Sequence, residues 1–260
     1  MKEILKYTMY DVVRSKWAIA YTVFFALLTT TFLLLSRDIN SSIISLMSIT
    51  LVLVPLISTI FSVIYYYNSR DYINLLLAQP VARKSLFLGQ YFGIASALAV
   101  CIAFGLLVPF FIFNLAGSGL IKSTLTLVGV NIMLTYIFSA IAFFIALKNE
   151  DKVRGFGLAI FSWLFFSVIY DGIFIFLLAI FREYPLENMA LAGSIFNPIN
   201  LSRILMLMQL DIAALLGLTG AVFTRFFGQS FGWILAMTML LLWFVIPLLG
   251  IVRRSMTRDF

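Results

Sequence analysis

The sequence has no histidine, a single cysteine and few charged residues, which make up only 11% of its 260 positions. Without histidine it lacks the commonest metal ligand and acid–base catalyst, and Cys101 alone cannot form an internal disulfide. A phosphate-binding loop of the type G-x-x-x-x-G-K-[ST] is absent too, because neither Lys84-Ser85 nor Lys122-Ser123 follows a glycine. The residue patterns of intramembrane proteases are also missing. We therefore expect no enzyme, no metal site and no cofactor in this chain.

Apolar residues are abundant instead, at 63% of the chain with 27 phenylalanines, and the mean hydropathy is +1.08. They form runs long enough to cross a hydrocarbon core, which takes about 20 residues of helix. Such runs must be helical, because only a helix satisfies its own backbone hydrogen bonds in lipid. We predict an all-α polytopic membrane protein, one transmembrane domain over residues 1–260, with about six spans near residues 17–35, 43–67, 89–115, 123–147, 155–181 and 231–252.

Lysine and arginine are unevenly distributed around these spans. Thirteen lie near the chain ends and in the second and fourth loops, and five lie on the other side. The positive-inside rule then places both termini in the cytoplasm of a bacterial or archaeal cell, with the protein in its plasma membrane. We assign the net charge of +7 to contact with anionic membrane lipids and not to nucleic acid. The charged first sixteen residues lack a cleavage site, so we expect the first span to be retained.

Two cytoplasmic segments have apolar faces. Residues 2–16 are predicted to form an amphipathic surface helix with Leu5, Met9, Val12 and Val13 on one side; a polar extension of the first span is the alternative. Residues 68–88 are predicted to contain a short helix, ended at Gln79-Pro80. That helix suits docking on a partner, or it lies in the membrane interface.

The long outer segment 182–230 contains a helix start at Asn197-Pro198. The apolar residues that follow recur at helical spacing: Leu201, Ile204, Leu205, Met208 and Ile212. This pattern favours an amphipathic helix on the outer membrane surface, and a re-entrant hairpin is the alternative. Met206 and Met208 point to different faces of such a helix, so we interpret them as hydrophobic contacts and not as metal ligands.

Asp171 is the acidic residue that falls well inside a predicted span, where a carboxylate is costly and faces protein or water. Three interpretations stay open: a polar site for translocation, a structural hydrogen bond with Asn131 as a candidate partner, or a location nearer the outer interface. In the third span, small residues recur every four positions, at Gly89, Gly93, Ala97, Cys101 and Gly105. This stripe predicts close packing of another helix.

Residues 75–83 read LLLAQPVAR and are followed by Leu88-Gly89-Gln90. Together with the six spans and the N-terminal helix, this stretch resembles the LLSQPVSR-x-x-x-LGK stretch of ABC-2 type permeases. Tyr170-Asp171 and the Asn197-Pro198-x-x-x-x-Arg203 run resemble, within that family, the permease subunit of the transporter that matures nitrous-oxide reductase. Gln90 stands where the family commonly has lysine.

The resemblance implies a homodimer that binds a separate cytoplasmic ABC ATPase, in which Mg-ATP is the cofactor. The residues it assigns to ATPase coupling are Arg70, Asp71, Leu75, Leu76, Gln79, Pro80, Arg83, Lys84, Glu150 and Lys152. Those assigned to a polar translocation region are Asp171, Tyr170 and Asn131. Contact with an extracytoplasmic accessory protein, which supplies copper or sulfur to the metalloenzyme, falls to Asn197, Pro198, Arg203 and Asp211. A secondary transporter and a membrane scaffold that is indifferent to ATP are the competing hypotheses.

Overall fold

The computed structural model describes residues 1–36, 39–77, 82–113, 121–180, 193–210 and 217–257. All regular elements in these residues are helical: α1 (Lys2–Arg14), α2 (Lys16–Leu35), α3 (Ile39–Asn68), α4 (Arg70–Leu77), α5 (Arg83–Ile112), α6 (Ile121–Lys148), α7 (Lys152–Leu164), the π-helix η2 (Phe165–Ile169), α8 (Tyr170–Ile180), α10 (Pro198–Gln209) and α11 (Gly217–Thr257).

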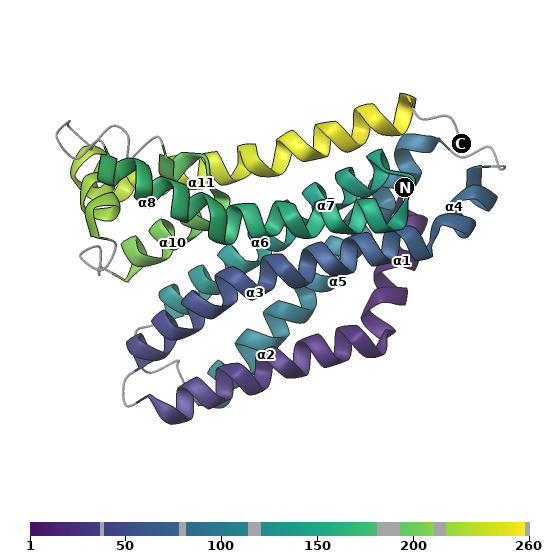
Figure 1. The fold of residues 1–260 in the computed structure, drawn as a ribbon. Coiled ribbons are helices and arrows are strands. Elements are labelled where there is room, and N and C mark those ends of the chain that lie inside the picture. Colours follow the sequence, from purple (N-terminus) through teal and green to yellow (C-terminus); the bar gives the residue numbers. More distant parts are fainter. Residues whose placement is uncertain (37–38, 78–81, 114–120, 181–192, 211–216, 258–260) are drawn as a thin grey trace.

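Six helical stretches of the described chain are long and apolar enough to cross a membrane: Lys16–Leu35, Asn40–Asn68, Arg83–Ile112, Ile121–Lys148, Lys152–Leu177 and Gly232–Met256. The predicted all-α polytopic fold is therefore confirmed, and each predicted span overlaps one of these stretches. The N-terminus, α4 and the end of α11 lie at one end of the bundle, which we call the basal end (Figure 1). The opposite end, which carries α8 and α10, is the distal end.

The predicted stripe of small residues on α5 is the contact surface for the N-terminal helices. A Cβ atom at Gly93 would lie 2.6 Å from Cβ of Thr8 on α1, and one at Gly89 would lie 3.1 Å from Ile4. Further along, a Cβ at Gly105 would lie 3.0 Å from Phe25 on α2. α1 and then α2 therefore pack along α5, against successive small residues of the stripe. The close packing that the stripe predicted is confirmed.

The chain breaks between α1 and α2 at Ser15, whose backbone is extended with ψ of 142°. The Ser15 hydroxyl accepts a hydrogen bond from the backbone N–H of Ala18 at 3.2 Å, which caps α2. α1 buries Thr8 and Val12 against the bundle, but Val13 is exposed. The predicted apolar face is therefore wrong at Val13, because the face that α5 covers is centred on Thr8.

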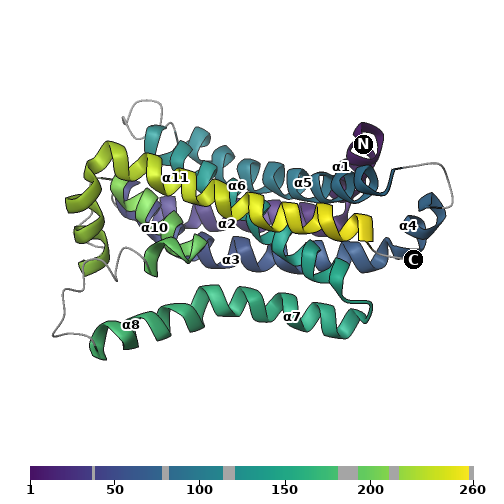
Figure 2. The same ribbon diagram turned by 90° about the horizontal axis from the view of Figure 1, so that it is seen from above.

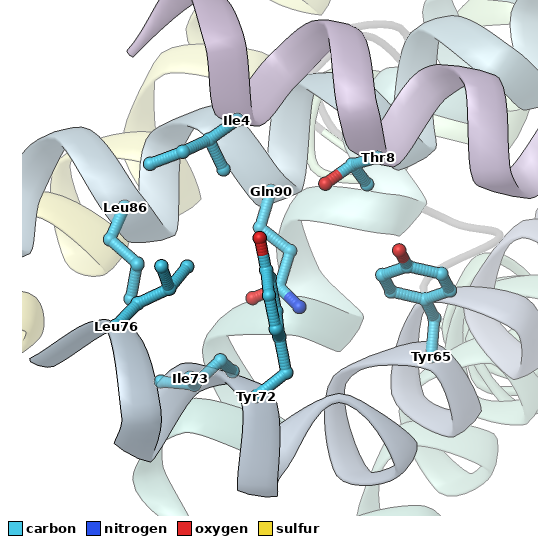
Figure 3. Close-up of a pocket in the computed structure, with 8 residues that line it drawn as sticks. All are labelled: Ile4, Thr8, Tyr65, Tyr72, Ile73, Leu76, Leu86 and Gln90. Atoms are coloured by element: carbon cyan, nitrogen blue, oxygen red, sulfur yellow. The ribbon is translucent and has the colours of Figure 1, made fainter.

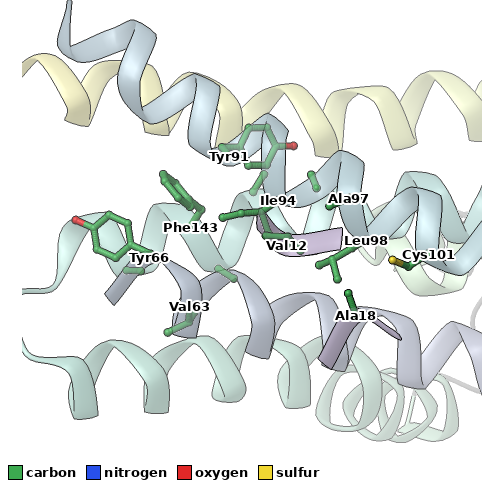
Figure 4. Packing of buried hydrophobic residues seen from close by; sticks show 14 of the residues in the cluster. Val12, Ala18, Val63, Tyr66, Tyr91, Ile94, Ala97, Leu98, Cys101 and Phe143 are labelled. Carbon is green, nitrogen blue, oxygen red and sulfur yellow. The ribbon is translucent and has the colours of Figure 1, made fainter. Parts of the chain in front are cut away.

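A core of buried apolar side chains joins α1, α2, α3, α5 and α6 (Figure 4). Tyr66 and Phe143 meet edge to face with ring centroids 5.2 Å apart. Cys101 belongs to this core (Figure 4), which agrees with a packing role for its side chain.

α3 and α6 pack along their lengths, and the amide of Asn131 lies between them. Its Nδ2 donates to the carbonyl of Leu127 at 2.8 Å and to the hydroxyl of Thr50 at 3.3 Å. Asn131 is fully buried there. The proposed pairing of Asn131 with Asp171 is therefore wrong, because the Asn131 amide hydrogen-bonds within the α3–α6 interface.

α7, η2 and α8 form one long helical segment along one side of the bundle (Figure 2). α10 packs between α3, α6 and α11 and buries nine of its residues: Pro198, Ile199, Leu201, Ser202, Ile204, Leu205, Met206, Leu207 and Met208. The prediction that this helix lies on the outer membrane surface is therefore wrong, because α10 is buried in the bundle. Its predicted start at Asn197-Pro198 is confirmed. Met206 and Met208 are both core side chains.

Candidate functional site

At the basal end, α4 exposes Leu75 and part of Tyr72 and holds Ile73 and Leu76 inward. Leu75 is 69% exposed, whereas Ile73 is buried. Leu76 is partly buried and packs against the core. Leu76 and Ile73 line a small, partly open cavity bordered by α1, α3, α4 and α5 (Figure 3). Of the two leucines predicted to contact a partner, Leu75 is available and Leu76 serves internal packing.

Contacts between aromatic rings tie α4 to α1. Tyr72 stacks on Tyr7 with ring centroids 5.6 Å apart. Tyr72 also borders the small cavity, together with Ile4 and Thr8 of α1 (Figure 3). A displacement of α4 would therefore also shift α1, which is itself packed on the glycines of α5.

The segment between α6 and α7 is joined by three hydrogen bonds to the end of α3 and the start of α4. The Tyr67 hydroxyl donates to the carbonyl of Asn149 at 2.9 Å. Arg70 Nη1 donates to the carbonyl of Glu150 at 3.0 Å. Lys152 Nζ donates to Oδ1 of Asn68 at 3.2 Å. The structure thus brings together two loops, 68–88 and 148–154, that are about 80 residues apart in the chain.

The other predicted coupling residues lie around this junction or outside the described chain. Asp71 is exposed on α4, and Arg83 and Lys84 are exposed at the start of α5. Gln79 and Pro80 lie outside the described residues. Val153 is 79% exposed beside Lys152, and it adds a second apolar side chain that the sequence did not single out. We define the basal surface as α4 together with residues 149–154.

At the distal end, Asp171 is held by donors from α10. Its Oδ1 accepts from Asn200 Nδ2 at 2.7 Å, and its Oδ2 lies 3.5 Å from Arg203 Nη1. Arg203 also donates to Oδ1 of Asn200 at 3.2 Å. Both charged side chains are partly exposed, Arg203 by 37% and Asp171 by 26%. We call Asp171, Asn197, Asn200 and Arg203 the distal cluster.

Asn197 connects this cluster to the π-helix. Its Oδ1 accepts from the N–H of Ile199 and so caps α10. Its Nδ2 donates to the carbonyl of Phe166 at 2.8 Å, within η2, and lies 3.4 Å from Oδ1 of Asp171. One side chain therefore joins the start of α10 to the irregular turn that precedes Asp171. Single π-turns inside helices often occur at functional sites.

Tyr170 belongs to the same region, because its hydroxyl donates to the carbonyl of Gly193 at 2.5 Å. Pro198 is buried at the first turn of α10, and Asp211 lies outside the described residues. Sequence reasoning had not assigned a role to Asn200, to Tyr67 or to the Asn149 carbonyl. Polar residues at span ends are the one signal that could have drawn attention to them.

Within the described residues, no three histidine, cysteine, aspartate or glutamate side chains come together as a metal site would require. The distal cluster consists of one carboxylate, two amides and one guanidinium, mutually bonded. Such a set holds two helices together and offers polar groups at the distal end.

Comparison with known proteins adds an independent observation. No protein-family model matches the chain. A protein of Stutzerimonas stutzeri, named probable ABC transporter permease protein NosY, is 29% identical over 234 residues, which cover 81% of this chain and 78% of that protein. A protein of Pseudomonas aeruginosa with the same name is 24% identical over 220 residues, 78% of this chain and 80% of that one.

Proposed function

We propose that this chain, which is similar to proteins named probable ABC transporter permease protein NosY, is the permease subunit of an ABC transporter, and that its basal surface binds the ATPase subunit of that transporter. The chain is then the membrane subunit, and ATP hydrolysis takes place on a separate cytoplasmic chain. The proposal includes the orientation that the positive-inside rule predicts, with both termini and the basal surface in the cytoplasm.

The observation that carries the proposal is the junction of the two loops. Residues 149–154 are hydrogen-bonded to Tyr67 and Asn68 at the end of α3 and to Arg70 at the start of α4. The outward side of α4 presents Leu75, and the neighbouring loop presents Val153. An apolar side chain surrounded by polar ones on a short helix is suited to insertion into a partner's groove. Because α4 also stacks on α1, a force applied there reaches both α1 and α5.

Replacing Leu75 by aspartate is expected to abolish stable binding of the ATPase encoded beside this chain. A central apolar contact contributes about 2 kcal/mol or more, and an unpaired carboxylate in its place adds a desolvation cost. The measurement is co-purification in detergent, with an expected loss of at least about thirtyfold in affinity. Phe196→Asp is the matched control, since Phe196 is 63% exposed at the distal end.

Binding that is equally weakened in both variants would show that the effect is general destabilisation and would contradict the assignment of the basal surface. Leu76 is not a suitable test position, because it lines the cavity beneath α4 and its replacement would disturb folding.

We further propose that ATP-driven motion of the basal end alters the distal end, where the distal cluster contacts an extracytoplasmic partner, and that two copies of this permease assemble with the ATPase. The resemblance stated above supports a role in supplying copper or sulfur to a metalloenzyme. Deletion of the gene in a denitrifying host is then expected to yield nitrous-oxide reductase with depleted copper centres, measured by metal content and absorption spectrum. Nitrous-oxide reductase with its full copper content in the deletion strain would contradict this part of the proposal.

A further inference from the structure

A cleft of about 350 Å³ lies at the basal end, where the break between α1 and α2 faces the last turns of α3. Its volume falls within the range of small-molecule sites. One part of its wall is polar, with Asp11, Ser15 and Asn68, and another is apolar, with Trp17, Phe61 and Ile64. The cleft therefore suits a ligand that is itself polar at one end and apolar at the other.

Its position places it at the boundary of the bilayer. α2 begins at Lys16 and has 20 residues, which at 1.5 Å each span about 30 Å, the thickness of the hydrocarbon core. α3 ends at Asn68 on the same side. Trp17 is 74% exposed, and tryptophan is enriched at the headgroup level. The polar wall thus lies among headgroups, and Phe61 lies about two turns deeper.

The charges on and beside the cleft are of both signs. Asp11 is the acidic residue of the wall, and its Oδ2 accepts from the Tyr65 hydroxyl at 2.9 Å. That bond fixes the carboxylate and leaves Oδ1 able to accept from a second donor. Lys16 follows Ser15 in the chain and is exposed. A ligand with a cation at its polar end would match Asp11, and Lys16 lies between the wall residues Ser15 and Trp17 in the chain.

We propose that this cleft binds a phospholipid with a primary-amine headgroup, of which phosphatidylethanolamine is the common bacterial type. The ammonium would donate to Asp11, the phosphate would lie beside Lys16, and an acyl chain would pack on Phe61. Phosphatidylcholine has no N–H to donate, and phosphatidylglycerol has no cation. The bound lipid would brace the break between α1 and α2 against α3. The proposal does not rest on the proposed ATPase contact, although the wall residue Asn68 accepts a hydrogen bond from Lys152 of the basal surface.

The test is native mass spectrometry of the full-length chain, released from micelles that contain equimolar phosphatidylethanolamine, phosphatidylcholine and phosphatidylglycerol with identical acyl chains. The wild type is expected to retain phosphatidylethanolamine about tenfold more than phosphatidylcholine, the size of one charged hydrogen bond. Asp11→Asn keeps an acceptor but removes the charge and is expected to weaken that preference, and Asp11→Glu is expected to keep it. Asp71→Asn, which removes an exposed carboxylate of α4 at the same end, is the matched control and leaves the preference unchanged.

Several results would overturn the proposal. One is equal retention of the two zwitterionic lipids by the wild type, and another is an unchanged preference in Asp11→Asn. If Asp11→Asn changes the ratio of monomer to dimer while lipid retention stays the same, a second copy of the chain covers the cleft. Should Asp11→Asn fail to fold, Lys16→Gln takes its place: lower retention of all three phospholipids supports the site, and unchanged retention contradicts it.

Discussion

Replacing Gly93 by leucine is expected to detach α1 from α5 and to expose the break at Ser15 to protease. A Cβ at this position would lie 2.6 Å from Cβ of Thr8 and 3.0 Å from the backbone carbonyl of Leu5. Because the second contact is with backbone, a rotamer change cannot relieve it, and the whole of α1 must move. Overpacking of this kind costs about 1–3 kcal/mol, and we expect the upper end of that range.

The measurement is the rate of tryptic cleavage at Arg14 and Lys16 in detergent. Opening of α1 becomes about tenfold more frequent for each 1.4 kcal/mol lost, so cleavage is expected to accelerate by at least about tenfold. A lower melting temperature should accompany it.

Gly129→Leu and Gly157→Leu are the matched controls, because a Cβ at either position meets no neighbour within 4 Å. Leucine has a higher helix propensity than glycine, so these variants should fold at least as well as the wild type. Equal acceleration of cleavage in all three variants would show that leucine acts through insertion or folding in general. The contact between α1 and α5 would then not be the cause.

The second large effect is expected at Asp171 and Arg203, from a double-mutant cycle. Arg203→Ala leaves the Asp171 carboxylate partly buried with only amide donors, and should lower stability by about 1.5–3 kcal/mol. Asp171→Asn should cost less, because an amide oxygen can still accept from Asn200 and Arg203 can turn to water. The double variant should be less destabilised than the sum of the two, with a coupling energy of about 1–2 kcal/mol.

Thermal unfolding of the purified chain in detergent, followed by the fluorescence of its tryptophans, measures all four members of the cycle. Additive effects would mean that the 3.5 Å approach of Arg203 to Asp171 contributes nothing to the folded state. In the complete transporter, the activity of Asp171→Asn distinguishes a structural role from a role in transport. If the variant is stable but does not transport, the charge of Asp171 has a functional role. If transport is unchanged, Asp171 serves only to join α8 and α10.

The six spans could be predicted because the membrane imposes a simple rule of length and polarity. The start of α10 was predictable for a local reason, since Asn197 caps the helix with its own side chain and Pro198 fits the first turn. Its burial was not, because a face that contacts lipid and a face that contacts protein are both apolar. The sequence pattern of Leu201, Ile204 and Leu205 is compatible with either environment.

Contacts between distant residues were the least predictable part. The glycines of α5 indicated a close helix contact, yet nothing in them indicated that α1 makes it. Asp171 has its partner Arg203 on another helix 32 positions later, and Asn131 was an equally reasonable choice by polarity alone. Leu75 and Leu76 are adjacent and identical in type, and only the packing of α4 assigns one to the surface and the other to the interior.

The π-helix at Phe165–Ile169 has a consequence for how this protein can vary. A π-turn amounts to one extra residue in an α-helix, and each residue of a regular helix turns the chain by about 100°. Loss of one residue between Phe165 and Ile169 would convert the π-turn into a regular α-helical turn and leave Asp171 in nearly the same orientation. Gain of one residue would rotate everything beyond it by about a quarter of a turn, and Asp171 would then face away from Arg203 and Asn200. This span can therefore lose one residue at the π-turn, but cannot gain one, without disturbing the distal cluster.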